Sequence, residues 1–147
     1  MIALALVGHS GALLDALRAM VAQAAPAVPV LTAGGTSTGN LGTSSPGIVA
    51  ALQAALRASH GDGVVVLFDL GSAVLALEVA LEELEPFDRA RVAVSDGPLV
   101  EGAVRAAVEA AGGASLAQVC AVADRERATA KLPSDWPDRP DGRAVAE

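Results

Sequence analysis

The segment ALVGHSG, residues 5–11, ends a run of small apolar residues at a histidine flanked by glycine and serine. Asp69 follows a second apolar run in the segment VVVLFDLGSA, residues 64–73. A carboxylate that accepts a hydrogen bond from one imidazole nitrogen fixes the tautomer and leaves the lone pair on the other nitrogen. Because that nitrogen is a nucleophile, His9 and Asp69 predict group transfer through the imidazole, provided that the fold brings them together.

Both residues also have ordinary structural interpretations. His9 could belong to a turn or hydrogen-bond to the backbone inside the core, and Asp69 could cap a helix. His60, the other histidine, lies in the segment SHGDG before the third apolar run. We therefore expect His60 in an exposed loop, at the opposite edge of the sheet from His9.

The residues near these two are of the kind that binds phosphate groups. A helix beginning near Ser10 would direct backbone N–H groups and the positive end of its dipole toward the imidazole. Further hydroxyl groups are offered by Thr43, Ser44 and Ser72. The sequence holds no G-x-x-x-x-G-K-[ST] or G-x-G-x-x-G motif and no paired acids for Mg²⁺. It therefore predicts a phosphate carrier that needs no cofactor, metal or nucleotide of its own.

Four short apolar runs alternate with amphipathic segments along the chain. Continuous hydrophobicity is typical of strands that are buried on both faces. The predicted strands are residues 2–7, 28–32, 63–68 and 91–95. Predicted helices carry the stripes Leu13, Leu14, Leu17, Met20, Val21 and Ile48, Val49, Leu52, Leu56, and two further helices cover residues 72–85 and 99–111.

Local signals set the ends of two helices. Ser45 is the expected N-cap of the second helix, with Pro46 at its first helical position. A last helix from Ser115 to about residue 127 competes with an edge strand over residues 117–122.

This alternation predicts a three-layer α/β/α fold with right-handed crossovers. The expected sheet is mainly parallel, with four strands in the order 2-1-3-4 and a fifth strand at one edge if residues 117–122 are extended. Binding residues of such sheets lie at the carboxyl ends of the strands. Since strands 1 and 3 are neighbours, His9 and Asp69 would face each other across the strand spacing of about 5 Å. The Gly/Ser/Thr-rich loop 33–44 and the segment SDGPLVEG, residues 95–102, would reach the same edge.

Composition restricts the remaining possibilities. The chain has 147 residues, a formal net charge of -7 and a pI near 4.7, which argues against a nucleic-acid or anionic-membrane surface. A lone cysteine, Cys120, excludes an internal disulfide and a cysteine-built metal site, and we expect it to be a small buried hydrophobe. Residues 2–7 lack the basic flank of a signal peptide, so we expect a cytoplasmic protein. Residues 1–127 should form one domain and residues 128–147 a flexible tail.

Four strings resemble one known family. They are LALVGHSGALLDAL, GTS at 42–44, VVVLFDLGSAVLALEVALEEL and GPLVEGAVRAAVEAAGGASL. Together they are similar to the EIIA-type domain of the DhaM family, the phosphotransfer subunits of dihydroxyacetone kinases that depend on the phosphoenolpyruvate phosphotransferase system. The resemblance covers about residues 1–122 and implies the fold of the mannose-family EIIA, an α/β domain that usually forms homodimers. Some members carry HPr-like and enzyme-I-like domains on the same chain, whereas this sequence is too short for them and would use separate partners.

The resemblance also implies roles for individual residues. His9 would be the phosphoacceptor, which receives phosphate from phospho-HPr and passes it to ADP bound in the subunit DhaL. The regenerated ATP would then phosphorylate dihydroxyacetone bound in DhaK. Asp69 matches the carboxylate beside the histidine. The residues that match the loops around it are Gly42, Thr43, Gly71 and Ser72, and with Ser10 and Ser44 they are the candidate phosphate-binding residues.

Four alternatives stay open at this level. Ser10 sits in a string that approximates the nucleophile elbow of an α/β-hydrolase, but that chemistry needs a later histidine and His60 is the one available. Asp69 could be a phosphoacceptor, as in receiver domains, although no acid cluster lies near the first strand. A mannose-type EIIA would pass phosphate from His9 to a sugar-transporter IIB domain. A non-enzymatic regulator would be phosphorylated at His9 and pass nothing on.

Overall fold

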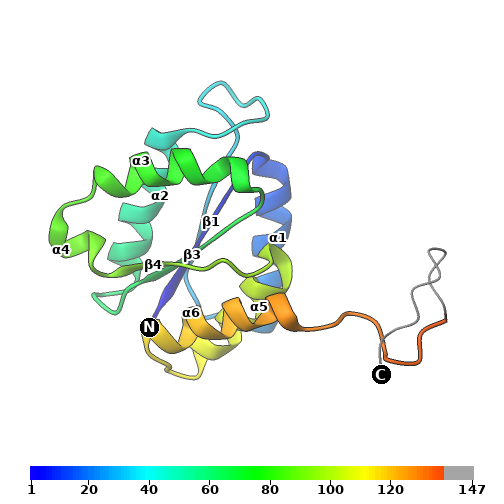
Figure 1. Ribbon diagram of the computed structural model, residues 1–147. Coiled ribbons are helices and arrows are strands. Elements are labelled where there is room, and N and C mark those ends of the chain that lie inside the picture. The colour runs from blue at the N-terminus through cyan, green and yellow to red at the C-terminus, as the bar shows by residue number, and fades with distance from the viewer. Residues whose placement is uncertain (138–147) are drawn as a thin grey trace.

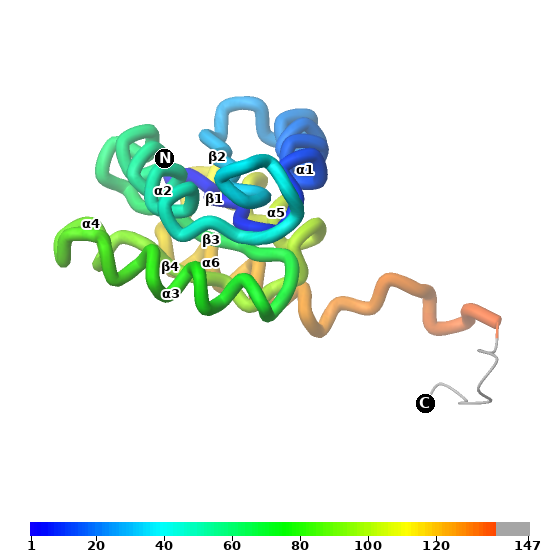
Figure 2. The backbone as a smooth tube through the Cα atoms, turned by 90° about the horizontal axis from the view of Figure 1, so that it is seen from above, coloured from blue at the N-terminus to red at the C-terminus, as the bar shows by residue number. Residues whose placement is uncertain are grey.

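A computed structural model of the chain describes residues 1–137. Its centre is one parallel sheet whose strands lie in the order β2-β1-β3-β4. The strands are β1 (Ala3–Gly8), β2 (Val30–Gly34), β3 (Val64–Phe68) and β4 (Val92–Val94). The predicted order and the parallel arrangement are therefore confirmed (Figure 2).

Helices cover both faces of this sheet (Figure 2). They are α1 (Gly11–Ala24), α2 (Ser45–Ala58), α3 (Val74–Glu82), α4 (Pro86–Arg89), α5 (Leu99–Ala111) and α6 (Leu116–Arg125), with short 3-10 turns at Gly71–Ala73 and Glu126–Ala128. Leu4 and Leu6 of β1 pack against α1, α5 and α6, whereas Ala5 and Val7 pack on the other side against α2 and α3. Because successive strand residues point to opposite faces, β1 must be apolar at every position, as its sequence is.

Small side chains allow α5 to approach the sheet closely. Ala103, Ala106, Ala107 and Ala110 are all fully buried on its inner face. A Cβ atom at Gly102 would lie 2.6 Å from the Leu67 side chain, so any larger residue there would force that side chain to shift. The segment that follows β4 is thereby fixed at the carboxyl edge of the sheet.

The last helix removes the alternative of a fifth strand. Residues 117–122 lie within α6, so the helix predicted from Ser115 is confirmed and the alternative of an edge strand there is wrong. Ser115 and Gln118 form a reciprocal capping box at the start of α6, which satisfies two free backbone donors and favours the helix over an extended segment. Val119 and Ala123 are buried against the same core as α5, and part-buried Cys120 packs beside them.

Several predicted boundaries shift by a few residues. Ser44, not Ser45, is the N-cap of α2, because its Oγ accepts a hydrogen bond from the Gly47 N–H at 3.2 Å. The helix predicted over 72–85 is divided into a 3-10 turn and α3, and Pro86 begins the separate α4.

The chain beyond Ala128 forms no helix or strand as far as residue 137 and is exposed there (Figure 1). The predicted flexible tail, residues 128–147, extends past the described residues and stays a prediction. No helix among residues 1–137 is long and apolar enough to cross a membrane.

Candidate functional site

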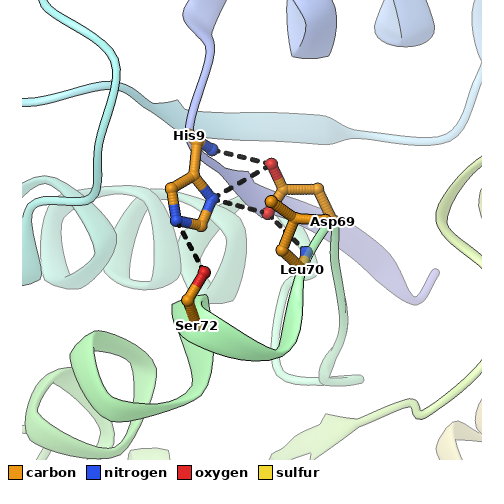
Figure 3. A network of polar contacts seen from close by, with 4 residues as sticks. All are labelled: His9, Asp69, Leu70 and Ser72. Atoms are coloured by element: carbon orange, nitrogen blue, oxygen red, sulfur yellow. Dashed lines mark hydrogen bonds and ion pairs between the residues drawn. The ribbon is translucent and has the colours of Figure 1, made fainter.

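His9 and Asp69 meet at the carboxyl edge of the sheet, each directly after a central strand. β1 ends at Gly8 and β3 ends at Phe68, and the two strands are hydrogen-bonded neighbours. Nδ1 of His9 lies 3.0 Å from Oδ1 and 3.2 Å from Oδ2 of Asp69. The backbone N–H of His9 also donates to Oδ2 at 2.9 Å (Figure 3). One carboxylate thus holds both the ring and the main chain of the histidine.

The carboxyl group of Asp69 is kept ionised by its hydrogen bonds. Its side chain is 11% exposed, and this burial by itself would raise the pKa of Asp69. Hydrogen bonds from the His9 backbone, the His9 ring and the Leu70 N–H, the last at 2.7 Å, outweigh that effect and hold the pKa below its usual value. Asp69 is therefore a charged acceptor for the imidazole at any physiological pH.

The second ring nitrogen of His9 faces the start of the 3-10 turn before α3. With Nδ1–H donating to Asp69, Nε2 carries the lone pair. The Ser72 hydroxyl lies 3.0 Å from Nε2 and is placed to donate to it. The His9 side chain is 26% exposed, so a reacting group can approach Nε2 from solvent. The arrangement is that of an oriented nucleophile with a hydroxyl donor beside it.

A missing Cβ atom makes room for the carboxylate. A Cβ at Gly8 would lie 2.8 Å from Oδ2 of Asp69, which is closer than real Cβ contacts allow. Gly8 is therefore needed for Asp69 to reach His9. On the other side of β1, a Cβ at Gly34 would lie 2.7 Å from the Ser10 carbonyl oxygen, so glycine also lets β2 approach the start of α1.

We expect Gly8→Ala to raise the pKa of Asp69 toward the ordinary value of about 4. The added methyl group pushes the carboxylate away from the His9 N–H and ring, and the hydrogen bonds that lower the pKa are weakened. Carbon-detected NMR titration of the aspartate carboxyl groups measures the change. Gly71→Ala is the matched control, because nothing lies within 4 Å of a Cβ at that position. An unchanged Asp69 titration in Gly8→Ala would contradict this account.

The structure places the remaining candidate residues in three different ways. Ser72 contacts the imidazole directly, and Gly42 touches His9 through its backbone N–H, which donates to the His9 carbonyl at 3.0 Å. Ser10 and Ser44 use their hydroxyls as N-caps of α1 and α2. Gly71 begins the 3-10 turn, with open space around it.

Two further groups near His9 and Asp69, the Thr43 side chain and the Leu70 N–H, lie on the loops that surround the site. Thr43 is half-buried between Gly42 and Ser44, on the loop that passes His9. Sequence reasoning missed the Leu70 N–H, which donates to Asp69 through the backbone alone. A sequence signal for this hydrogen bond does exist, namely an aspartate followed by a turn that contains glycine. In such turns the carboxylate commonly accepts hydrogen bonds from the backbone N–H groups that follow it.

The segment after β4 borders the acid rather than the histidine. Asp96, Gly97 and Pro98 line a groove of about 510 Å³ together with Phe68 and Asp69. Its far wall is formed by the chain after α6, where Arg127 pairs with Asp96 and Lys131 pairs with Glu101.

The two alternatives based on other nucleophiles find little support in this geometry. His60 lies in the exposed turn between α2 and β3, at φ +52°, and so at the amino edge of the sheet. A hydrolase triad with Ser10 would need it at the carboxyl edge. Among residues 1–137, no group of three or more His, Cys, Asp or Glu side chains is arranged to hold a metal ion, whereas receiver domains use such a cluster beside their aspartate.

Comparison with known proteins gives one family model, which describes a phosphotransferase-system component, and several relatives, which are DhaM subunits of dihydroxyacetone kinases. The family model EIIA-man, described as "PTS system fructose IIA component", matches residues 3–120. The chain is 35% identical over 123 residues to the phosphoryl donor subunit DhaM of the PEP-dependent dihydroxyacetone kinase of Providencia stuartii, covering 81% of this chain and 25% of that protein. It is 34% identical over 110 residues to DhaM of dihydroxyacetone kinase 2 of Listeria innocua, covering 74% of this chain and 86% of that protein.

A solved structure has the same architecture. The crystal structure of EF1359, a protein of unknown function, superposes with a TM-score of 0.73 at 32% sequence identity and covers 85% of this chain and 95% of that chain. The chain thus spans about a quarter of the Providencia relative and most of the Listeria relative.

Proposed function

We propose that this chain, which belongs to the EIIA-man family of phosphotransferase-system components, carries a phosphoryl group on Nε2 of His9. Within that family it belongs to the DhaM phosphoryl donor subunits. The observation that supports this proposal most is the orientation of the imidazole. Asp69 occupies Nδ1 from one side, the Ser72 hydroxyl lies 3.0 Å from Nε2, and the His9 side chain is 26% exposed.

Uptake is a direct transfer between two proteins. The lone pair of Nε2 attacks the phosphorus of a phosphohistidine on phospho-HPr, the phosphorus–nitrogen bond of the donor breaks, and its electron pair returns to the donor nitrogen. The Nδ1 proton stays on the ring and keeps its hydrogen bond to Asp69. That carboxylate offsets the positive charge that the ring develops as the new bond forms.

The groups around Nε2 supply donors for the transferring oxygens. The Ser72 hydroxyl can turn from Nε2 to a phosphoryl oxygen without moving its helix. Residues at the starts of α1 and of the turn at Gly71–Ala73, together with Thr43 on the passing loop, complete the proposed phosphate-binding set.

Delivery reverses the same step. An oxygen of the terminal phosphate of ADP, held in DhaL beside DhaK, attacks phosphorus, and the Nε2 bond breaks with its electrons returning to the ring. Dihydroxyacetone is then phosphorylated by the regenerated ATP. We further propose that the protein acts in the cytoplasm and as a homodimer, which sedimentation of the purified chain measures.

Reconstitution tests this function. The chain is mixed with enzyme I, HPr and labelled phosphoenolpyruvate, and label on the protein is followed. A phosphohistidine survives alkali and is lost in acid, whereas an acyl phosphate on Asp69 is lost in alkali. No label on the chain would contradict the proposal.

The phosphorylated chain is then offered two acceptors. Loss of label with DhaL, DhaK and ADP supports the dihydroxyacetone pathway. Loss of label only to a sugar-transporter IIB domain favours the mannose-type alternative, and retention with both acceptors favours a regulator.

Ser72→Ala should slow uptake from phospho-HPr about fivefold. The variant loses one neutral hydrogen bond near the reacting nitrogen, which is typically worth about 1 kcal/mol. Rapid-quench measurement of label uptake gives the rate. Ser37→Ala, an exposed serine of the loop between β2 and α2, is the control, and equal rates for the two variants would remove Ser72 from the site.

A further inference from the structure

The loop between β2 and α2 is attached to the site at both of its ends. The Gly35 N–H donates to the Gly8 carbonyl at 3.3 Å, and the Gly42 N–H donates to the His9 carbonyl at 3.0 Å. Gly8 and His9 are consecutive at the end of β1, so the loop begins and ends beside the reactive histidine. Figure 1 shows this loop, in cyan, beyond the carboxyl end of the strands. The residues between the two attachments therefore determine where Gly42 and Thr43 lie relative to the imidazole.

Residues 36–40 close the middle of this loop as a tight turn. The Thr36 N–H donates to the Asn40 carbonyl at 2.9 Å, and the Gly39 N–H donates to the Thr36 carbonyl at 3.0 Å. Gly39 has a φ of +82°, the left-handed conformation that hairpin turns of three residues commonly require at their last position. Because Gly39 occupies the Thr36 carbonyl, the Asn40 N–H needs another acceptor.

The Thr36 hydroxyl is that acceptor. Its Oγ1 accepts from the Asn40 N–H at 3.1 Å and lies 3.1 Å from the Thr38 hydroxyl, to which the Asn40 side chain also donates at 3.2 Å. The Thr36 methyl group faces Gly42, because a Cβ atom at Gly42 would lie 2.8 Å from it. One half-buried side chain thus closes the turn and contacts the residue that is hydrogen-bonded to His9.

The composition of the loop makes this closure important. Four of the nine residues 34–42 are glycine, and glycine loses more conformational freedom on ordering than any other residue. Each hydrogen bond that closes the turn therefore raises the fraction of molecules in which Gly42 and Thr43 lie beside the imidazole.

We infer that Thr36 is a positioning residue for phosphoryl transfer, and that its hydroxyl holds residues 42–44 against His9. The inference rests on the proposed function, in which Thr43 is one of the groups that bind the transferring phosphoryl oxygens. The hydrogen bonds of the Thr36 side chain stay within the turn. Thr36 therefore acts on the reaction through Gly42 and Thr43 and does not contact the reacting atoms itself.

Thr36→Val should lower the saturating rate of uptake from phospho-HPr about fivefold, the effect of losing one neutral hydrogen bond. Valine keeps the shape of threonine and the methyl group that faces Gly42, but it cannot accept from the Asn40 N–H. The phospho-HPr concentration that gives half the saturating rate should stay within about twofold of the wild-type value, because the lost contact lies inside the loop. Rapid-quench measurements over a range of phospho-HPr concentrations give both quantities.

Two variants control for the substitution itself. Thr36→Ser retains the hydroxyl, so its saturating rate should lie within about twofold of the wild-type rate. Thr32→Val makes the same change in β2, where the threonine hydroxyl donates to Asp15 at 3.4 Å and where valine suits the strand. The uptake rate of Thr32→Val should equal that of the wild type.

Hydrogen exchange at the Gly42 amide tests the positioning directly. In Thr36→Val the Gly42 N–H should exchange faster than in the wild type, because it is bonded to the His9 carbonyl for a smaller fraction of the time. The Leu14 amide, which donates to the Ser10 carbonyl at the start of α1, should exchange at an unchanged rate. A general loss of stability would accelerate the exchange of both amides.

The outcomes separate this inference from the proposed function. If the wild type takes up phosphate and Thr36→Val has the same saturating rate, or if Thr36→Ser or Thr32→Val is equally slow, the Thr36 hydroxyl does not position the loop and the proposed function stands. An unchanged Gly42 exchange rate in Thr36→Val, or a change in the half-saturating concentration alone, would also overturn the inference. If the wild type takes up no phosphate, the proposed function fails and the inference fails with it.

Discussion

His9→Ala is expected to take up no phosphate from phospho-HPr, with labelling reduced to background. The variant lacks the nitrogen to which the phosphorus bonds, and no neighbouring group can replace it. Ser72 and Ser10 carry hydroxyls, but neither lies beside a free base, and the Ser10 hydroxyl caps α1. The fold should persist because the backbone N–H of residue 9 can still donate to Asp69. Label uptake and far-UV circular dichroism measure the two expectations separately.

His60→Ala provides the comparison within the same chain. His60 is exposed in a turn at the opposite edge of the sheet, so its loss should leave uptake at the wild-type rate. Its left-handed backbone conformation costs about 1 kcal/mol in any residue with a Cβ, and alanine retains that cost. Equal labelling of the two variants would refute the assignment of His9.

Asp69→Asn is expected to slow phosphoryl uptake about 10²-fold while the fold is retained, an effect typical of losing the carboxylate that orients a functional histidine. The amide can turn its NH₂ group toward Nδ1. The ring then holds its proton on Nε2, and the lone pair needed for attack is lost. An amide oxygen facing Nδ1 would keep the tautomer but would not offset the charge on the ring during transfer. Rapid-quench kinetics of uptake measure the rate.

The pH dependence of stability offers a second readout for Asp69→Asn. The pKa of Asp69 is lowered in the folded protein, so its ionisation stabilises the fold at pH values above about 4, the ordinary value for the unfolded chain. That contribution is lost as the pH falls through the lowered pKa. The difference in free energy of unfolding between wild type and Asp69→Asn should therefore shrink in acid. A wild-type uptake rate in Asp69→Asn, with the same stability difference at all pH values, would leave Asp69 a structural residue.

The order of the sheet could be predicted because its central strands are apolar at every position. The first and third strands, IALALV and GVVVLF, have no polar side to expose, so they must lie inside the sheet. The polar residues that follow them, His9 and Asp69, therefore locate the site at the carboxyl edge. Periodicity alone could not exclude an edge strand over 117–122, because the segment LAQVCAV fits both a strand and a helix period. The Ser115–Gln118 capping box settles the choice, and its residues were already present in the sequence.

Other details depend on contacts that no local pattern encodes. Both Ser44 and Ser45 precede Pro46, and which of them caps α2 depends on where the loop leaves His9. The close approach of Gly8 to Asp69 requires the register of β1 against β3. The assignment of Nε2 as the free nitrogen needs the side-chain geometry of His9 and Asp69, which the sequence does not contain.

The two members of the His9–Asp69 pair are attached to β1 and β3, the inner strands of the sheet. Fraying of an outer strand such as β4 leaves both in place, because inner strands open only when the whole domain unfolds. Amide hydrogens of β1 and β3 should accordingly be among the slowest to exchange. We therefore expect partial denaturation that frays β4 to leave the contact between His9 and Asp69 intact.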